Sequence, residues 1–172
     1  MDERVHGQDY AALVTQLYET YANDVLRVSY FYLGDRQKAE DVMQEVFLRL
    51  YTKQPVLEEG KEKAWLLKVA LNLCRDIWRT GWAKRVILGS AVLDMIPAQE
   101  DDIDNRLEKE ALLQAVHSLP ANVREVFILF YYQGYGIEEI AAMLNAPAGT
   151  ISSRLSRGRL KLKELLERSD GR

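Results

Sequence analysis

The sequence predicts an all-α protein built from two small helical domains joined by a flexible linker. Three observations favour this class: helix-forming Leu, Ala, Glu, Lys and Arg are abundant, apolar residues recur at helical spacing, and no segment alternates apolar and polar residues as a half-buried strand does. Only four prolines and ten glycines interrupt the 172 residues. That length is enough for one ordinary domain or two small ones.

We expect helices over residues 9–32, 35–53, 61–80, 105–118, 121–133, 136–144 and 148–167. Asp35 is a suitable N-cap for the second helix, and Pro120 suits the first turn of the fifth. The segment 81–104 contains Gly81, Gly89 and Pro97 and ends in an acidic cluster. It is long for an internal loop, so we interpret it as an interdomain linker. The predicted units are a domain at 9–84, a linker at 85–104 and a domain at 105–168.

Composition excludes several classes of function. The net charge is −3 and the pI is about 5.5, so any nucleic-acid binding must be local. A single cysteine, Cys74, rules out an internal disulfide and a cysteine zinc cluster. The sequence has only two histidines, too few for a histidine-rich metal site, so we expect no metal and no cofactor. No apolar run reaches the ~18 residues of a membrane span, and the acidic start lacks a signal-peptide core, which predicts a cytoplasmic protein.

The stretch Ile137 to Arg159 is the most informative part of the chain. It predicts a short helix, a tight turn and a second helix, with Ile140 and Leu144 facing inward and Ile151 anchoring the second helix. Asn145 stands where the turn needs a left-handed residue, a conformation that Asn tolerates well. This order and spacing are typical of a helix-turn-helix, whose second helix enters the major groove of DNA.

The outer face of that second helix is polar and basic. No Asp or Glu occurs between Thr150 and Lys163, which favours a polyanionic partner over a merely structural hairpin. The candidate contacts to duplex DNA are Thr150, Ser152, Ser153, Arg154 and Arg157, with Arg159 and Lys161 placed to follow phosphates.

The helix at 61–80 carries a second polar arc opposite its apolar side. Its members are Lys68, Asn72, Arg75, Asp76 and Arg79. A solvated helix face is an equally good interpretation of this arc alone. Arg and Lys suit phosphates and Asn suits a base edge, so the arc also fits an unpaired nucleic-acid strand. Trp78 falls on the apolar side, where we expect it to pack in the core.

The helix at 35–53 has an unusual outer face. Ala39, Val42, Met43, Val46, Phe47 and Leu50 form its core stripe. Asp41, Gln44, Glu45, Leu48 and Tyr51 lie opposite. Ordinary solvated surface is the simpler interpretation, but apolar residues framed by polar ones often mark a protein interface.

Three blocks in this order resemble the extracytoplasmic-function (ECF) group of bacterial sigma factors, a branch of the sigma-70 family. The first is AEDVMQEVFLRLY at 39–51, the second KAWLLKVALNLCRDIWR at 63–79, and the third runs from LPANVREVFILFYYQ to RLKLKELL at 119–166. The agreement of three blocks is far more specific than any one of them. This chain departs from the family in the turn, where Asn145 replaces the usual Gly.

The resemblance implies roles by position. Asp41, Gln44, Glu45 and Phe47, with Leu48 and Tyr51 beside them, match the helix that docks on the β′ clamp of core RNA polymerase, although Phe47 also belongs to the core stripe. Asn72, Arg75, Asp76 and Arg79, with Lys68, match the segment that opens and reads the −10 element. The helix-turn-helix matches the domain that reads the −35 element and meets the β flap.

Two hypotheses of function follow. The resemblance implies an initiation subunit that directs core RNA polymerase to promoter DNA, has no catalytic residues of its own, and is restrained by an anti-sigma factor, a class of protein that is often membrane-bound. The alternative is a stand-alone helix-turn-helix regulator, which leaves the face at 39–51 without a role. An enzyme is the weakest option, because no glycine-rich phosphate loop and no paired acid and base are present.

Overall fold

The computed structural model describes residues 2–80 and 113–171 of the chain. Its first three helices are α1 (Asp2–Leu33), α2 (Arg36–Lys53) and α3 (Glu62–Arg79). Residues 113–117 are helical, and α5 (Ala121–Phe127), the π-helix η3 (Ile128–Tyr132), α6 (Ile137–Leu144) and α7 (Ala148–Asp170) follow. The described residues contain no strand, which confirms the all-α prediction. The predicted linker at 85–104 lies outside them.

The helix boundaries follow from local chemistry. Asp35 is extended (φ −131°) and its side chain accepts a hydrogen bond from the Lys38 amide at 2.8 Å, which confirms the predicted N-cap of α2. Gly34 (φ 71°) ends α1 in the left-handed region, which glycine adopts without strain. The N-terminal helix begins seven residues earlier than expected, at Asp2 rather than residue 9.

The predicted helix at 121–133 has the right span but not a uniform winding. Its first half, α5, is an ordinary α-helix, and from Ile128 to Tyr132 the backbone widens into a π-helix. Such turns are rare in proteins, and each backbone hydrogen bond in them spans five residues instead of the four of an α-helix. Side-chain periodicity does not reveal the change, because both forms present apolar residues to the same core.

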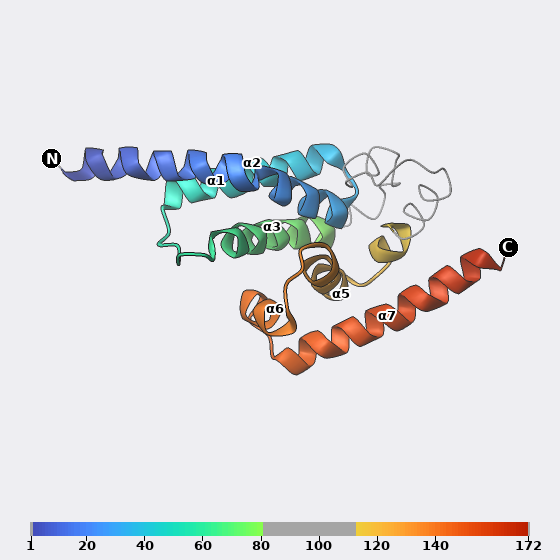
Figure 1. The fold of residues 1–172 in the computed structure, drawn as a ribbon. Helices are drawn as coiled ribbons and strands as arrows, with labels where there is room; N and C mark the ends of the chain where they lie inside the picture. The colour runs from blue at the N-terminus through green and yellow to red at the C-terminus, as the bar shows by residue number, and fades with distance from the viewer. Residues whose placement is uncertain (1, 81–112, 172) are drawn as a thin grey trace.

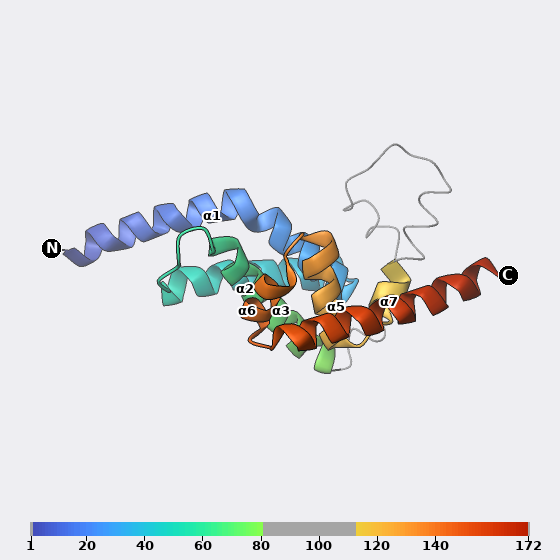
Figure 2. The same cartoon turned by 60° about the horizontal axis from the view of Figure 1, so that its bottom comes forward.

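The first three helices pack side by side, and α5 and α6 lie against the underside of α3 while α7 extends away as a long arm (Figures 1 and 2). One continuous apolar core joins the two groups: it includes Leu66 and Leu71 of α3 together with Leu119, Val126 and Ile140 of the second group. Among the described helices, none has the length and apolar character to cross a membrane. The two helical groups that the sequence predicts are therefore in direct contact.

Candidate nucleic-acid interface

The helix-turn-helix forms as the sequence predicts. Asn145 adopts the left-handed conformation (φ 52°, ψ 50°) at the end of α6, and the Ala146 amide donates to the Ala141 carbonyl at 3.0 Å. Ile151 and Leu155 are buried, which fixes the rotation of α7 about its axis. The turn and the two buried residues together decide which side chains of α7 face outward.

The outward face of α7 is polar at its start. Ser152, Ser153 and Arg157 are exposed, and Thr150 and Arg154 are half-buried. These side chains come from the first three turns of the helix, the part that reaches base edges when a recognition helix enters a major groove. The geometry therefore leaves this row free to meet a duplex.

The two basic residues farther along α7 differ from each other. Lys161 is exposed, as a phosphate contact requires. Arg159 instead turns back toward η3, where its Nε donates to the Tyr131 hydroxyl at 2.5 Å and its guanidinium lies 5.9 Å from the Phe130 ring centroid. Its charge remains exposed, but its side chain is held against aromatic rings rather than extended toward solvent.

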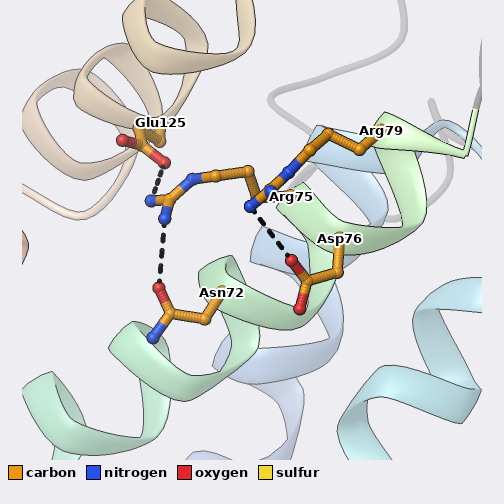
Figure 3. Close-up of polar contacts among 5 residues, drawn as sticks. All are labelled: Asn72, Arg75, Asp76, Arg79 and Glu125. Carbon is orange, nitrogen blue, oxygen red and sulfur yellow. Dashed lines mark hydrogen bonds and ion pairs between the residues drawn. The ribbon is translucent and has the colours of Figure 1, made fainter.

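The polar arc of α3 lies where the helical wheel predicts. Lys68, Asn72, Asp76 and Arg79 are exposed, and Arg79 pairs with Asp76 at 3.2 Å. Arg75 is different: its side chain is 33% exposed, and its guanidinium bonds both Asn72 Oδ1 at 3.3 Å and Glu125 Oε2 at 2.6 Å (Figure 3). The arc is thus partly occupied by a carboxylate from α5.

Glu125 and its neighbour Arg124 are the residues that sequence reasoning missed. Both are almost fully buried, at 3% and 1% exposure, although both are charged. Burial raises the pKa of Glu125. The hydrogen bond and charge of Arg75 lower this pKa, and the charge of Arg154 lowers it by a smaller amount, but burial outweighs both. Two adjacent charges inside the apolar run from Val123 to Leu129 were the available signal, because such residues are seldom buried without partners.

Trp78 packs between the two helical groups. Its indole lies edge-on to Tyr32 at 6.1 Å and to His117 at 4.8 Å, with the Arg124 guanidinium 3.8 Å from its ring centroid. Burial lowers the pKa of His117 to about 4, with a further lowering effect from Arg124, while the Leu33 carbonyl at 3.3 Å opposes it. The prediction that Trp78 packs inside rather than binding a ligand fits this position.

The outer face of α2 is exposed and mixed in character. Leu48 and Tyr51 are 55% and 52% exposed, Asp41 and Gln44 are also exposed, and Glu45 is half-buried and pairs with Arg49 at 2.9 Å. Phe47 does not fit the prediction that it contacts a partner. It is 6% exposed and packs edge-on against Tyr18 at 5.0 Å, so it supports this face from within.

Comparisons with known proteins agree with the geometry. The family model for sigma-70 region 2 matches residues 17–85, and the model for sigma-70 region 4 matches residues 109–162. These spans contain the α2 and α3 faces and the helix-turn-helix, respectively.

Individual relatives extend the match to most of the chain. The ECF RNA polymerase sigma factor SigM of Bacillus subtilis is 31% identical over 161 residues, which cover 90% of this chain and 96% of SigM. SigE of Mycolicibacterium smegmatis is 32% identical over 165 residues, or 92% of this chain, but the match spans only 64% of that longer protein.

Among solved structures, the sigma factor RpoE of Bartonella quintana, crystallised with the anti-sigma factor NepR, is similar with a TM-score of 0.70 and 28% identity. The match covers 89% of this chain and 96% of RpoE. The two family models match in the expected order, and SigM is matched along nearly its whole length. The chain therefore belongs to the ECF subfamily of sigma-70 RNA polymerase sigma factors.

Proposed function

We propose that this chain is a dissociable initiation subunit that binds core RNA polymerase and directs it to promoters through two separate DNA contacts. The observation that carries the proposal is the outward row of Ser152, Ser153 and Arg157 on a correctly formed helix-turn-helix, in a chain that also presents the α3 arc. Family membership favours this function over a stand-alone regulator.

The division of labour follows the faces. The start of α7 reads the −35 element as duplex, with Thr150, Ser152, Ser153, Arg154 and Arg157 at base edges and phosphates and Lys161 on the backbone. The α3 arc receives bases that leave the duplex at the −10 element, with Asn72 at base edges and Lys68, Arg75 and Arg79 at phosphates. The chain itself performs no chemistry, because the polymerase supplies the active site.

The α2 face is the proposed contact with the polymerase β′ clamp. Leu48 and Tyr51 are large apolar side chains that are more than half exposed and are framed by Asp41, Gln44 and Glu45. Such a centre with a polar rim is typical of a transient protein interface. The domain at 105–168 is the proposed partner of the β flap. The proposed domain limits, 9–84 and 105–168 with a linker between them, are supported by the spans of the two family models.

An anti-sigma factor is the proposed negative regulator. The support is that the solved RpoE relative is bound to one, NepR. Because the proposed partner is RNA polymerase, the proposed site of action is the cytoplasm.

The test is transcription in vitro with core RNA polymerase on a library of randomised promoters, followed by sequencing of the transcripts. We expect transcripts that share two elements at a constant spacing. Arg154→Ala should weaken binding to the upstream element by about 1–3 kcal/mol, roughly 5- to 160-fold, and leave affinity for core polymerase intact. Arg168→Ala, an equivalent charge loss at the far end of α7, is the matched control and should have little effect.

Core binding is tested separately. Leu48→Ala should weaken binding to polymerase by about 1 kcal/mol or more, as loss of a central interface residue does, and leave the preferred promoter unchanged. Val56→Ala removes a fully exposed apolar side chain between α2 and α3 and serves as the control. A chain that yields no shared promoter elements, or one that binds DNA tightly as a dimer without polymerase, contradicts the proposal.

A further inference from the structure

One large apolar side chain lies on the outward side of α7. α5 and α6 pack on the other side of this helix, where Leu155 and Leu162 are buried (Figure 1). Leu160 precedes Leu162 by two residues, about 200° around the helix axis, and it is 61% exposed. In the part of the chain that the structure describes, it is the one large apolar residue of α7 that is exposed. Leu160 therefore faces away from the core.

The neighbours of Leu160 on the helix surface give its exposure a meaning, because a single exposed leucine is ordinary on a protein. Four exposed residues follow the spacing i, i+3, i+4 and i+7, which places them on one side of α7: Ser153, Ser156, Arg157 and Leu160. This row extends over about 10 Å of the helix axis. A known class of recognition helix contacts bases in the major groove with residues at the same spacing. The row therefore has the geometry of a base-reading face.

An acidic residue ends the part of this row that suits DNA. Glu164 is exposed and follows Leu160 by four residues, about one turn farther along the same side. Phosphates repel a carboxylate at that place, whereas no acidic residue occurs between Thr150 and Lys163. Leu160 is therefore the last residue of the row whose chemistry is compatible with a close approach to DNA.

A leucine side chain favours one kind of contact in the major groove. The C5-methyl group of thymine is the apolar group that base edges present there, and apolar side chains contact it. Over guanine, cytosine or adenine, leucine would cover hydrogen-bonding groups without replacing the water that satisfies them. A leucine at the end of a row of serines and an arginine thus favours thymine at the position that it covers.

We propose that Leu160 is a specificity-determining residue for the upstream element, and that its side chain contacts the methyl group of a thymine at one end of that element. The inference rests on the proposed function, because that function places the start of α7 in the major groove of the −35 duplex. It adds a base-reading residue about one turn beyond Arg157. It also adds a preference that hydrogen bonds alone do not supply.

The experiment removes the methyl group from the DNA and the side chain from the protein, separately and together. The upstream element is taken from the transcripts of the promoter library. Each thymine in it, on either strand, is replaced in turn by uracil, which pairs in the same way but lacks the C5-methyl group. Core polymerase carrying the parent chain or Leu160→Ala is then bound to each promoter fragment, and affinities are compared by competition at one salt concentration.

With the parent chain, we expect uracil to weaken binding about fourfold at one thymine, the factor that corresponds to burial of a single methyl group. With Leu160→Ala, thymine and uracil should bind equally at that position, and binding elsewhere in the element should keep its pattern. Leu160→Met keeps an apolar side chain of similar volume and should restore the difference. Val56→Ala removes an apolar side chain that is fully exposed outside α7, and it should behave as the parent chain does.

Both Leu160 variants should fold, because the residue lies outside the buried core and alanine and methionine are good helix formers, and circular dichroism verifies this. A parent chain that binds thymine and uracil equally at every position overturns the proposal, and so does a difference that survives in Leu160→Ala. Lower affinity of Leu160→Ala for core polymerase, with the thymine preference intact, also overturns it and assigns the leucine to a protein contact.

The proposed function and this inference fail in different ways. A library that yields no upstream element overturns the proposed function, and this inference with it. A shared upstream element that contains no thymine sensitive to loss of its methyl group overturns this inference alone.

Discussion

The close approach of α7 to α5 at Gly158 yields a sharp stability prediction. A Cβ added at Gly158 would lie 2.1 Å from Phe127 Cε2 and 2.8 Å from Val123 Cγ1. The first distance falls short of a carbon contact of roughly 3.5 Å by about 1.4 Å. Phe127 cannot move aside freely, because it is 5% exposed and packs on Tyr131 at 5.1 Å.

The expected cost combines two opposing effects. Overpacking of this severity costs about 3 kcal/mol, the upper end of the usual range, while Ala gains about 1 kcal/mol over Gly in a helix interior. Gly158→Ala should therefore lower the free energy of unfolding by about 2 kcal/mol, or the Tm by roughly 4–8 °C in a chain of this size. Urea and thermal unfolding followed by circular dichroism measure it.

The matched control is Gly149→Ala, in the first turn of the same helix. No heavy atom lies within 4 Å of a Cβ at Gly149, so the substitution should be neutral or stabilising by up to about 1 kcal/mol. If Gly158→Ala is as stable as the parent chain, or more stable, then α7 does not pack on α5 as closely as the structure has it, and the reasoning is refuted.

Three further predictions follow from buried polar groups. The pKa of His117 falls from about 6.5 unfolded to about 4 folded, so its contribution to stability is complete above about pH 6.5 and is lost as the pH falls toward 4. Between pH 7 and pH 5.5 the free energy of unfolding should fall by about 1 kcal/mol, after allowance for the partial exposure of His117. Urea unfolding at the two pH values should show a smaller fall in His117→Gln than in the parent chain. The Tyr32 hydroxyl is buried and has no hydrogen-bond partner among the described residues, so Tyr32→Phe should raise the free energy of unfolding by up to about 1 kcal/mol, and a loss of stability would reveal a hidden partner. Burial raises the pKa of the Cys74 thiol to about 12, so at pH 8 it should react with a disulfide reagent roughly a thousandfold more slowly than a free thiol, and rapid labelling of the folded chain would contradict its burial.

Most local structure could be predicted because it depends on neighbours in the sequence. Asp35 caps α2 and Asn145 turns the chain left-handed, and both effects act over three or four residues. The apolar stripe of α2 was predicted equally well, since helical periodicity alone decides which residues share a face, and all six of its residues are buried. Phe47 shows the limit: the family resemblance placed it in an interface, while its position in the stripe correctly placed it in the core.

The contacts between the helical groups could not be predicted in the same way. Arg75 and Glu125 are 50 residues apart, and nothing in the spacing of either helix connects them. Arg124 resembles a surface residue until the carbonyls and rings that surround it are assembled from three segments.

The sequence by itself therefore determined the helices, their inward faces and the family. Capping, turn conformation and helical periodicity depend only on residues that are close together in the sequence. Only the tertiary structure decided that the two helical groups share a core and that a buried carboxylate holds an arginine of the proposed −10 face. Those features arise from the free energy of bringing distant charges and rings together, which no local pattern encodes.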